Sequence, residues 1–341
     1  MSSDFVSTAS CIIGIIAASI FTLSIVLLQG LAIKTIFEVR RITSAHDVGR
    51  KSDELTEAWR PFIRPHSKTL PPLWSMILRA LFVAPFGFVG IILAVLTTSA
   101  TAFVTSPRNS LQVAHVCGNI VARLAGVSCV EWRGKAASAK EAPLVVANHI
   151  SWIDFIVLGA TIKFGFVMSE GVSKVPLIGA GFTKLAQHVG SIVLDRGDAK
   201  SREAAKLKIK EKLDFIQTSN HGERLLVFSE GTLTNGEYVV PFKLGAFESL
   251  KPTQPLRLEF TNPHFSLACL GTLEGTLLFL CLGSTQLTFT WGEVVSPSED
   301  DTRGTFAEKV RISMVKGSDM IVAKTGSYRD HLALYANRQL I

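Results

Sequence analysis

Two long segments without a charged side chain lie in the N-terminal third of the chain. The first covers residues 5–33 and the second covers residues 80–107. A helix that crosses a bilayer needs about 20 mostly apolar residues, so both segments predict membrane helices. A cleaved signal peptide is the alternative for the first segment. Its apolar part would span about 7–15 residues after basic side chains, whereas only Asp4 precedes this longer run.

The second apolar segment permits more than one arrangement. Pro85, Gly87 and Gly90 allow a kink or a re-entrant hairpin, and a buried core helix is a further alternative. Residues 34–79 carry nine Lys and Arg against five acidic side chains, and this excess predicts that they lie in the cytosol. If residues 80–107 cross the membrane, the remainder of the chain lies on the opposite side. If they re-enter, it stays cytosolic.

From residue 108 onward, short β-rich runs alternate with helical ones. The expected strands cover residues 127–133, 143–147, 164–168, 191–194, 225–228, 256–260 and 286–295, and the expected helices cover residues 109–125, 151–160, 178–188, 199–217 and 305–315. Such alternation predicts an α/β domain with a mostly parallel sheet flanked by helices and preceded by membrane helices. The predicted parts are a transmembrane helix (1–34), a basic cytosolic linker (35–79), a second membrane segment (80–107), the α/β domain (108–296) and a helical tail (297–341).

Composition and charge narrow the class of protein. The chain is 48% hydrophobic and 18% charged, below the roughly 25% charged residues of an average soluble domain, so neither a disordered chain nor an ordinary soluble protein is expected. The net charge is +7, and six Lys and Arg fall in the helix 199–217. A solvated face explains such a run, and attraction to anionic lipid or to coenzyme phosphates is the alternative. No element resembles a nucleic-acid reader, and the five scattered cysteines predict no metal centre.

The first candidate for chemistry is the run from Asn148 to Asp154, which follows an apolar strand. In a regular helix His149 and Asp154 would point roughly 140° apart, so they pair only if His149 lies on the turn before the helix. Ser151 is a credible N-cap, with Asp154 as its capping partner. The alternative is that Asp154 only caps the helix while His149 lies in a loop.

Three further candidates follow predicted strands. Glu230, Gly231 and Thr232 come directly after the strand 225–228, at the edge where open α/β sheets place ligands. Arg196 follows the strand 191–194, where its guanidinium can hold a phosphate with two hydrogen bonds or form a surface ion pair. Lys243 precedes a glycine turn and adds positive charge.

These blocks, in this order, resemble the glycerolipid acyltransferase superfamily. That family has the blocks N-H-x-x-x-x-D, G-x-I-x-x-x-R, F-P-E-G-T and V-P, which match residues 148–154, 190–196, 228–232 and 240–241. The Thr-Asn pair at 234–235 and the run F-K-L-G-A-F that begins at Phe242 are similar to the lysophosphatidylcholine acyltransferase branch. One departure is Ser229, which stands where the family usually has proline.

The resemblance implies transfer of an acyl group from coenzyme A thioester to the free hydroxyl of a lysophospholipid, such as lysophosphatidylcholine. His149 would be the general base, because histidine titrates near neutral pH, and Asp154 would orient it, without an acyl-enzyme. Asn148, Arg196, Glu230, Gly231, Thr232 and Lys243 would bind substrate. Acyl-CoA is a co-substrate, so no cofactor and no metal are expected.

The implied partners are acyl-CoA, a lysophospholipid and the membrane bilayer, without nucleic acid. The resemblance also implies an integral protein of the endoplasmic reticulum or a related endomembrane, with its active site facing the cytosol. Three alternatives stay open. They are a 1-acylglycerol-3-phosphate acyltransferase, a catalytically inactive lipid-binding or scaffold protein, and a lipid hydrolase that uses His149 and Ser151.

Overall fold

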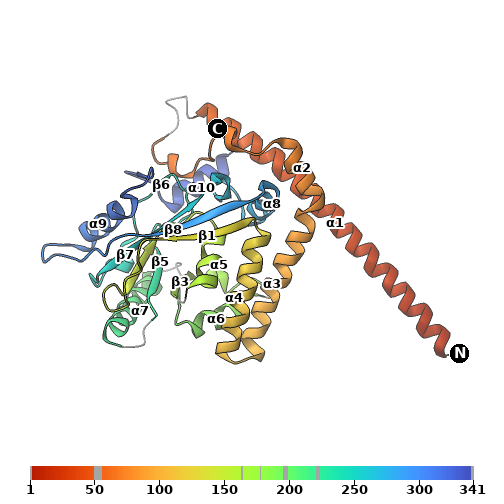
Figure 1. Ribbon diagram of the computed structural model, residues 1–341, viewed down its shortest axis with the longest axis horizontal. Coiled ribbons are helices and arrows are strands. Elements are labelled where there is room, and N and C mark those ends of the chain that lie inside the picture. The colour runs from red at the N-terminus through yellow and green to blue at the C-terminus, as the bar shows by residue number, and fades with distance from the viewer. Residues whose placement is uncertain are drawn as a thin grey trace.

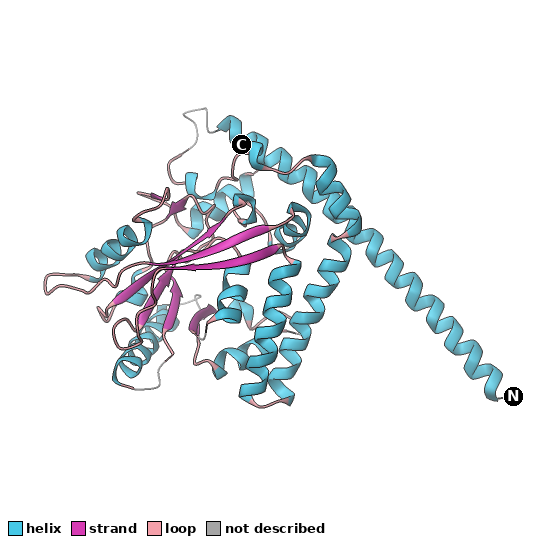
Figure 2. Ribbon diagram, in the orientation of Figure 1, coloured by secondary structure: helices cyan, strands magenta, loops and turns pink. Residues whose placement is uncertain are grey.

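The structure, a computed structural model, describes residues 2–49, 56–162, 164–176, 178–194, 199–219 and 223–338. Within this part of the chain, seven strands form one sheet in the order β1-β8-β7-β2-β5-β3-β4, visible in Figure 2. The strands are β1 (Val127–Arg133), β2 (Leu144–Ala147), β3 (Gly165–Ser169), β4 (Ile192–Leu194), β5 (Leu225–Phe228), β7 (Thr253–Phe260) and β8 (Thr285–Trp291). A separate pair consists of β6 (Tyr238–Val239) and β9 (Ile321–Val322).

The sheet is mostly parallel, as the sequence predicts. β7, β2, β5, β3 and β4 run in one direction, while β8 is antiparallel to β7, and β1 pairs with β8 in parallel. All four residues of β2 are buried, as expected for a central strand covered on both faces. The carboxyl ends of β2 and β5 therefore meet at one edge, with Ala147 opposite Phe228.

Helices cover both faces of the sheet (Figure 1). The α-helices in the described residues are α1 (Ser2–Gly49), α2 (Leu73–Phe82), α3 (Ala84–Val104), α4 (Pro107–Leu124), α5 (Trp152–Thr161), α6 (Gly179–His188), α7 (Ala199–Thr218), α8 (Thr272–Leu282), α9 (Arg303–Val315) and α10 (Tyr328–Asn337). The predicted strands and helices of the α/β domain are present to within a few residues. The exception is the last strand, since β8 ends at Trp291 where Gly292 abuts Pro255.

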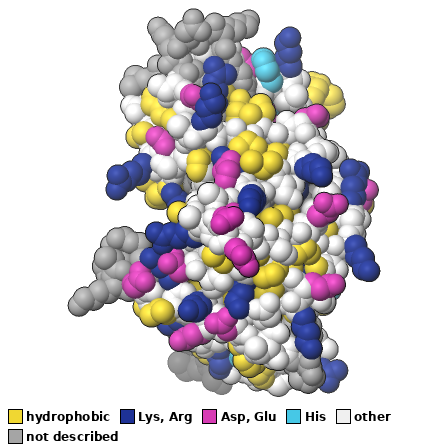
Figure 3. Space-filling model, turned by 90° about the vertical axis from the view of Figure 1, so that its left-hand side faces the viewer, with side chains coloured by type: hydrophobic (Ala, Val, Ile, Leu, Met, Phe, Trp, Pro, Cys, Tyr) yellow, Lys and Arg dark blue, Asp and Glu magenta, His cyan; other side chains and the backbone are white. Residues whose placement is uncertain are grey.

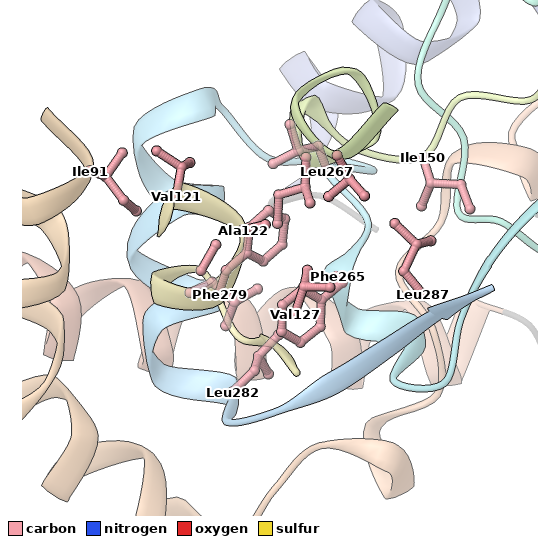
Figure 4. Packing of buried hydrophobic residues seen from close by; sticks show 14 of the residues in the cluster. Ile91, Val121, Ala122, Val127, Ile150, Phe265, Leu267, Phe279, Leu282 and Leu287 are labelled. Atoms are coloured by element: carbon pink, nitrogen blue, oxygen red, sulfur yellow. The ribbon is translucent and has the colours of Figure 1, made fainter. Parts of the chain in front are cut away.

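Side chains that alternate along the strands pack into two hydrophobic cores, one on each face of the sheet. Val145 and Ala147 of β2 face the larger core, which also contains α4, α5 and α8, whereas Leu144 and Val146 face the smaller core beside α7 and α9. Figure 4 shows part of the larger core. There the rings of Phe265 and Phe279 stack with centroids 5.1 Å apart.

The N-terminal region differs from the prediction. The first helix does not end near residue 34, because α1 continues without a break to Gly49. Its second half packs Ala32, Ile36 and Val39 into the larger core, and this spacing of three and four residues forms one helix face. The predicted linker 35–79 is therefore largely ordered structure. The second apolar run is divided between the end of α2 and α3.

A proline-rich strap, residues 59–72, leads from α1 to α2 across the α/β domain. Arg64 at its centre is fully buried, and burial lowers its pKa to about 10. Its guanidinium donates to the backbone carbonyls of Ser266 and His264 at 2.5 and 3.2 Å. These carbonyls replace the water that the buried cation has lost, so the strap is fixed to the domain.

Candidate active site

The candidate active site begins where β2 ends. His149 occupies the turn between β2 and α5, and Ser151 is the N-cap of α5, with its hydroxyl accepting the backbone N–H of Ile153 at 3.3 Å. Asp154 completes a capping box. Its Oδ2 accepts the backbone N–H groups of Ile150 and Ser151 at 2.6 and 2.9 Å. The capping interpretation of Asp154 is therefore correct.

The same carboxylate also contacts the imidazole, so Asp154 caps α5 and pairs with His149 at once. His149 Nδ1 lies 3.1 Å from Asp154 Oδ2. Asp154 is fully buried, whereas the His149 side chain is 23% exposed. One ring edge is therefore held by a buried carboxylate, and the edge that carries Nε2 faces the accessible side.

The imidazole is also held by packing against an aromatic ring. The ring of Phe228, the last residue of β5, stacks on the His149 ring with centroids 4.1 Å apart and planes 18° apart. Ile150, the next residue in the chain, belongs to the larger core with Leu267 and Leu287 (Figure 4). The turn that carries His149 is thus anchored on both sides of this residue.

Asn148 does not face a substrate, contrary to the prediction. It is fully buried, and its side-chain amide pairs with the backbone of Leu258 in β7. Asn148 Nδ2 donates to the Leu258 carbonyl at 3.0 Å, and Asn148 Oδ1 accepts the Leu258 N–H at 2.8 Å. The side chain extends the pairing of β2 with β7 past the last strand residue, and so it supports the turn that carries His149.

Glu230 also points into the protein instead of toward a bound acceptor. Its side chain is fully buried, with Oε2 accepting the backbone N–H of His149 at 2.6 Å and Oε1 accepting that of Val240 at 3.1 Å. Burial raises the pKa of Glu230 to about 8, because the charged form loses its hydration. The carboxyl group joins the third sequence block to the turn that carries His149 and to the fourth block at Val240.

Thr232 is turned away from the accessible side as well. It is buried, and its Oγ1 lies 3.2 Å from Nδ1 of His331 in α10. Gly231 is half-buried with φ +65°, a backbone conformation that favours glycine. A Cβ at this position would lie 3.1 Å from Cγ of Lys243. Lys243 is exposed, so its charge is available beside the Gly231 turn.

The structure therefore divides the predicted site residues into two groups. His149, Gly231 and Lys243 reach the accessible side, whereas Asn148, Glu230 and Thr232 support the site from within the protein. Arg196 lies outside the described residues. Among the residues that are described, no group of three His, Cys, Asp or Glu side chains is placed to hold a metal ion.

An apolar cavity of about 890 Å³ lies between the sheet and α3, α4, α5 and α6. Its walls are mostly apolar, and they include Phe155, Gly159 and Met168. Met168 belongs to β3, which pairs in parallel with β5, the strand whose last residue stacks on His149. Ligand sites of 300–1,000 Å³ with apolar walls are typical of small-molecule pockets.

Two features of the site were not predicted from the sequence. Phe228 was part of a recognised block, but its ring contact with His149 depends on the parallel pairing of β2 with β5. The cavity lies between the sheet and α3, α4, α5 and α6, so it depends on how these helices pack in the folded protein.

Comparison with known proteins agrees with this geometry. Residues 129–256 match the family model Acyltransferase. The lysophosphatidylcholine acyltransferase of Drosophila melanogaster is 31% identical over 220 residues, which are 62% of this chain and 40% of that protein. The lysophospholipid acyltransferase LPEAT2 of Arabidopsis thaliana is 30% identical over 155 residues, 46% of this chain and 27% of that protein. The chain thus spans less than half the length of either relative.

A solved structure has the same fold. The 1-acyl-sn-glycerophosphate acyltransferase PlsC of Thermotoga maritima aligns with a TM-score of 0.50 at 17% identity, over 70% of this chain and 96% of that chain. The helix-flanked sheet thus has the fold of this solved structure, and the paired His149 and Asp154 lie within the residues that match the Acyltransferase model. Over residues 129–256 the chain is similar to the Acyltransferase family, and over 62% of its length it is similar to a lysophosphatidylcholine acyltransferase.

Proposed function

We propose that the protein is an acyl-CoA-dependent lysophospholipid acyltransferase that acylates the free hydroxyl of lysophosphatidylcholine or a similar lysophospholipid. The observation that carries this proposal is the contact between His149 Nδ1 and the buried Asp154 carboxylate. Two relatives are named as acyltransferases of lysophospholipids, and this supports the choice of acceptor.

The geometry accounts for direct transfer with one base. Asp154 holds the proton on His149 Nδ1, so Nε2 is free to take the proton of the acceptor hydroxyl as that oxygen attacks the thioester carbonyl. The coenzyme A thiolate leaves, and the new ester bond forms in one complex. Ser151 is a poor nucleophile for a covalent route, because it is buried and its hydroxyl caps α5.

The acceptor phosphate has a candidate partner beside the base. Lys243 is exposed next to the half-buried Gly231, and Gly231 follows Glu230, which binds the His149 backbone. A positive charge there would attract the phosphate that every lysophospholipid carries. We assign Lys243 to this contact, together with Arg196 as the family resemblance implies.

The apolar cavity is the proposed place for the acyl chain of the donor. Gly159 of α5 lines it, and a Cβ added at this position meets no atom within 4 Å. We therefore expect Gly159→Leu to shorten the cavity, because the first carbon of the new side chain enters open space. Two substrates that differ by one methylene group in an apolar pocket differ by about 10–200-fold in kcat/KM. The ratio of kcat/KM for a sixteen-carbon acyl-CoA to that for a ten-carbon acyl-CoA should fall at least about 10-fold.

Gly159→Ala is the matched control for this experiment. It adds a single methyl group, so the chain-length preference should stay close to that of the wild type. It should also raise stability by up to about 1 kcal/mol, because alanine is the better helix former. A Gly159→Leu protein with an unchanged chain-length ratio would place the acyl chain elsewhere.

The helix packing bears on how the chain meets the membrane. Among the described residues, two helices are long and apolar enough to cross a bilayer, one within Ile16–Gly49 and one at Ala84–Val104. The first half of α1 extends away from the domain (Figure 1), and Ile20 and Leu27 are exposed on it. We propose that this half is the helix that crosses.

The second apolar helix, α3, is bound to the domain along its length. A Cβ at Gly87 would approach Leu280 of α8 to 2.5 Å, and a Cβ at Gly90 would approach Leu124 of α4 to 2.8 Å. Near the other end of α3, Ser99 donates to the carbonyl of Ile178 at 3.1 Å.

The helix beside it, α4, is too polar for the bilayer centre, with Arg108 and Arg123 on it and both side chains in contact with solvent. We propose that α3 lies at the membrane surface and does not cross. In this arrangement the domain lies on the same side of the membrane as the basic segment 34–79, which is the cytosolic side. This is the orientation that we propose for the protein in the endoplasmic reticulum. The face on the left of Figure 1, away from α1, carries both signs of charge, as expected for a solvated surface (Figure 3).

Labelling of cysteines tests this arrangement. Cys129 is exposed on β1, so a membrane-impermeant thiol reagent should label it in sealed endoplasmic-reticulum vesicles whose cytosolic face is outward. A Ser3→Cys variant should gain a second label only after detergent opens the vesicles, because residue 3 lies at the N-terminal end of the crossing half of α1, across the bilayer from the domain. Protection of Cys129 until the vesicles are opened would mean that α3 crosses as well.

The activity itself is tested by free-thiol release from acyl-CoA by the purified full-length protein. Release should require a lysophospholipid, and the acceptor with the highest kcat/KM identifies the head group among lysophosphatidylcholine, lysophosphatidylethanolamine and lysophosphatidate. Fatty acid release without an acceptor would favour a hydrolase. A folded protein without release for any acceptor would favour an inactive lipid-binding protein.

A further inference from the structure

The loop that follows β5, Ser229–Gly236, is held by three segments that are far apart in the sequence. We call it the motif loop. The backbone N–H of Thr234 donates to the carbonyl of His149 at 2.9 Å. Asn235 contacts the N-terminal strap, and Thr232 contacts the C-terminal helix α10. The catalytic turn thus shares its support with both ends of the chain.

The contact with the strap is made by the backbone and the side chain of Asn235. Its N–H donates to the carbonyl of Pro61 at 2.8 Å, and its Nδ2 donates to the carbonyls of Arg60 and Ile63 at 3.0 and 3.3 Å. Phe62 lies between these residues and is fully buried. The strap therefore presents the Phe62 ring at a fixed position behind the motif loop.

The C-terminal helix completes this arrangement. His331 of α10 stacks on Phe62, with centroids 5.3 Å apart and planes 9° apart, and its Nδ1 lies 3.2 Å from Oγ1 of Thr232. Burial lowers the pKa of His331 to about 4, so the imidazole is neutral at working pH. Leu334, one turn further along α10, is fully buried in the same cluster as Phe62.

We propose that His331 is a positioning residue of the acyltransferase site. Its hydrogen bond to the Thr232 hydroxyl lies on the buried side of the motif loop. This contact keeps the Gly231 turn and Lys243 aligned with His149. The strap and α10 lie outside residues 129–256, the part that matches the family model, so the inference extends the functional unit to both flanks of that part. It rests on the proposed function and assigns His331 to the acceptor side of the same site.

The test compares His331→Phe, Thr232→Val and the double variant in the full-length protein. Phenylalanine keeps an aromatic ring that can stack on Phe62 and removes both ring nitrogens, including the Nδ1 that contacts Thr232. Each single change should lower kcat/KM for the lysophospholipid about 10-fold, a loss typical of one hydrogen bond, and leave the KM for acyl-CoA unchanged. The double variant should also lose about 10-fold, because both changes remove the same contact.

Two matched variants separate positioning from general damage. Thr232→Ser keeps the hydroxyl and should retain kcat/KM within about twofold. Leu332→Ala changes an exposed neighbour of His331 on α10 and should behave as the wild type. Thermal unfolding of all the variants confirms that each is folded at the assay temperature.

Three results would overturn the positioning role. They are wild-type kinetics in His331→Phe, losses that multiply to about 100-fold in the double variant, and equal changes in the KM values for both substrates. A wild-type protein without acceptor-dependent transfer would instead overturn the proposed function. An active wild type with unaffected variants overturns only the assignment of His331.

Discussion

Replacing His149 with alanine is expected to lower acceptor-dependent acyl transfer by about 10²–10⁴-fold, the range for loss of a general base. The imidazole is the group held with one edge on Asp154 and the other on the accessible side. Without the imidazole, none of the described side chains is placed in this way to take the proton of the acceptor hydroxyl. The measurement is kcat for thiol release from acyl-CoA at saturating lysophospholipid.

Glu299→Ala serves as the control, since Glu299 is exposed in the loop after β8 and the mechanism gives it no role. It should keep the wild-type kcat. The His149→Ala protein should bind acyl-CoA with an unchanged Kd, because the imidazole is assigned to the chemical step. Retained turnover in a folded His149→Ala sample would remove His149 from the role of base.

Asp154→Asn is expected to cause a loss of similar size. In serine hydrolases the corresponding change costs about 10⁴-fold, because the amide favours the wrong imidazole tautomer. The amide oxygen of this variant could still accept the N–H groups of Ile150 and Ser151, which now bind Asp154 Oδ2, so the cap would be partly kept. We expect kcat to fall by about 10²–10⁴-fold while the protein remains folded.

Ser151→Ala separates capping from catalysis at this position. It removes the hydroxyl that accepts the N–H of Ile153 and should cost about 0.5–2 kcal/mol of stability. The carboxylate of Asp154 keeps its contact with the imidazole, so kcat should change only a few-fold. If Asp154→Asn were no more impaired in kcat than Ser151→Ala, Asp154 would be a cap alone.

The pairing of His149 with Asp154 could be predicted because both residues are local to one helix start. Ser151 identifies the N-cap, and the cap then places Asp154 near the preceding turn. The roles of Asn148, Glu230 and Thr232 could not be predicted in this way. Whether a side chain at a strand end faces a ligand or a backbone amide depends on partners far along the chain.

Those partners are known only from the tertiary structure. Leu258 pairs with Asn148, Val240 with Glu230 and His331 with Thr232, over separations of 10 to 110 residues. The same limit explains the helices that were not predicted. α8 is apolar around its whole circumference and buried on most sides, so it has no polar face from which a helical period could be recognised.

The continuous course of α1 has a mechanical consequence. Its 48 residues correspond to about 72 Å at 1.5 Å per residue, more than twice the roughly 30 Å thickness of the hydrocarbon layer. In the proposed arrangement, the part of α1 outside the bilayer continues the crossing part as one helix and is packed into the domain. A helix adjusts to a thinner or thicker bilayer by tilting, and here the whole domain must tilt with it. The angle at which the site meets the lipid surface is therefore coupled to the thickness of the membrane.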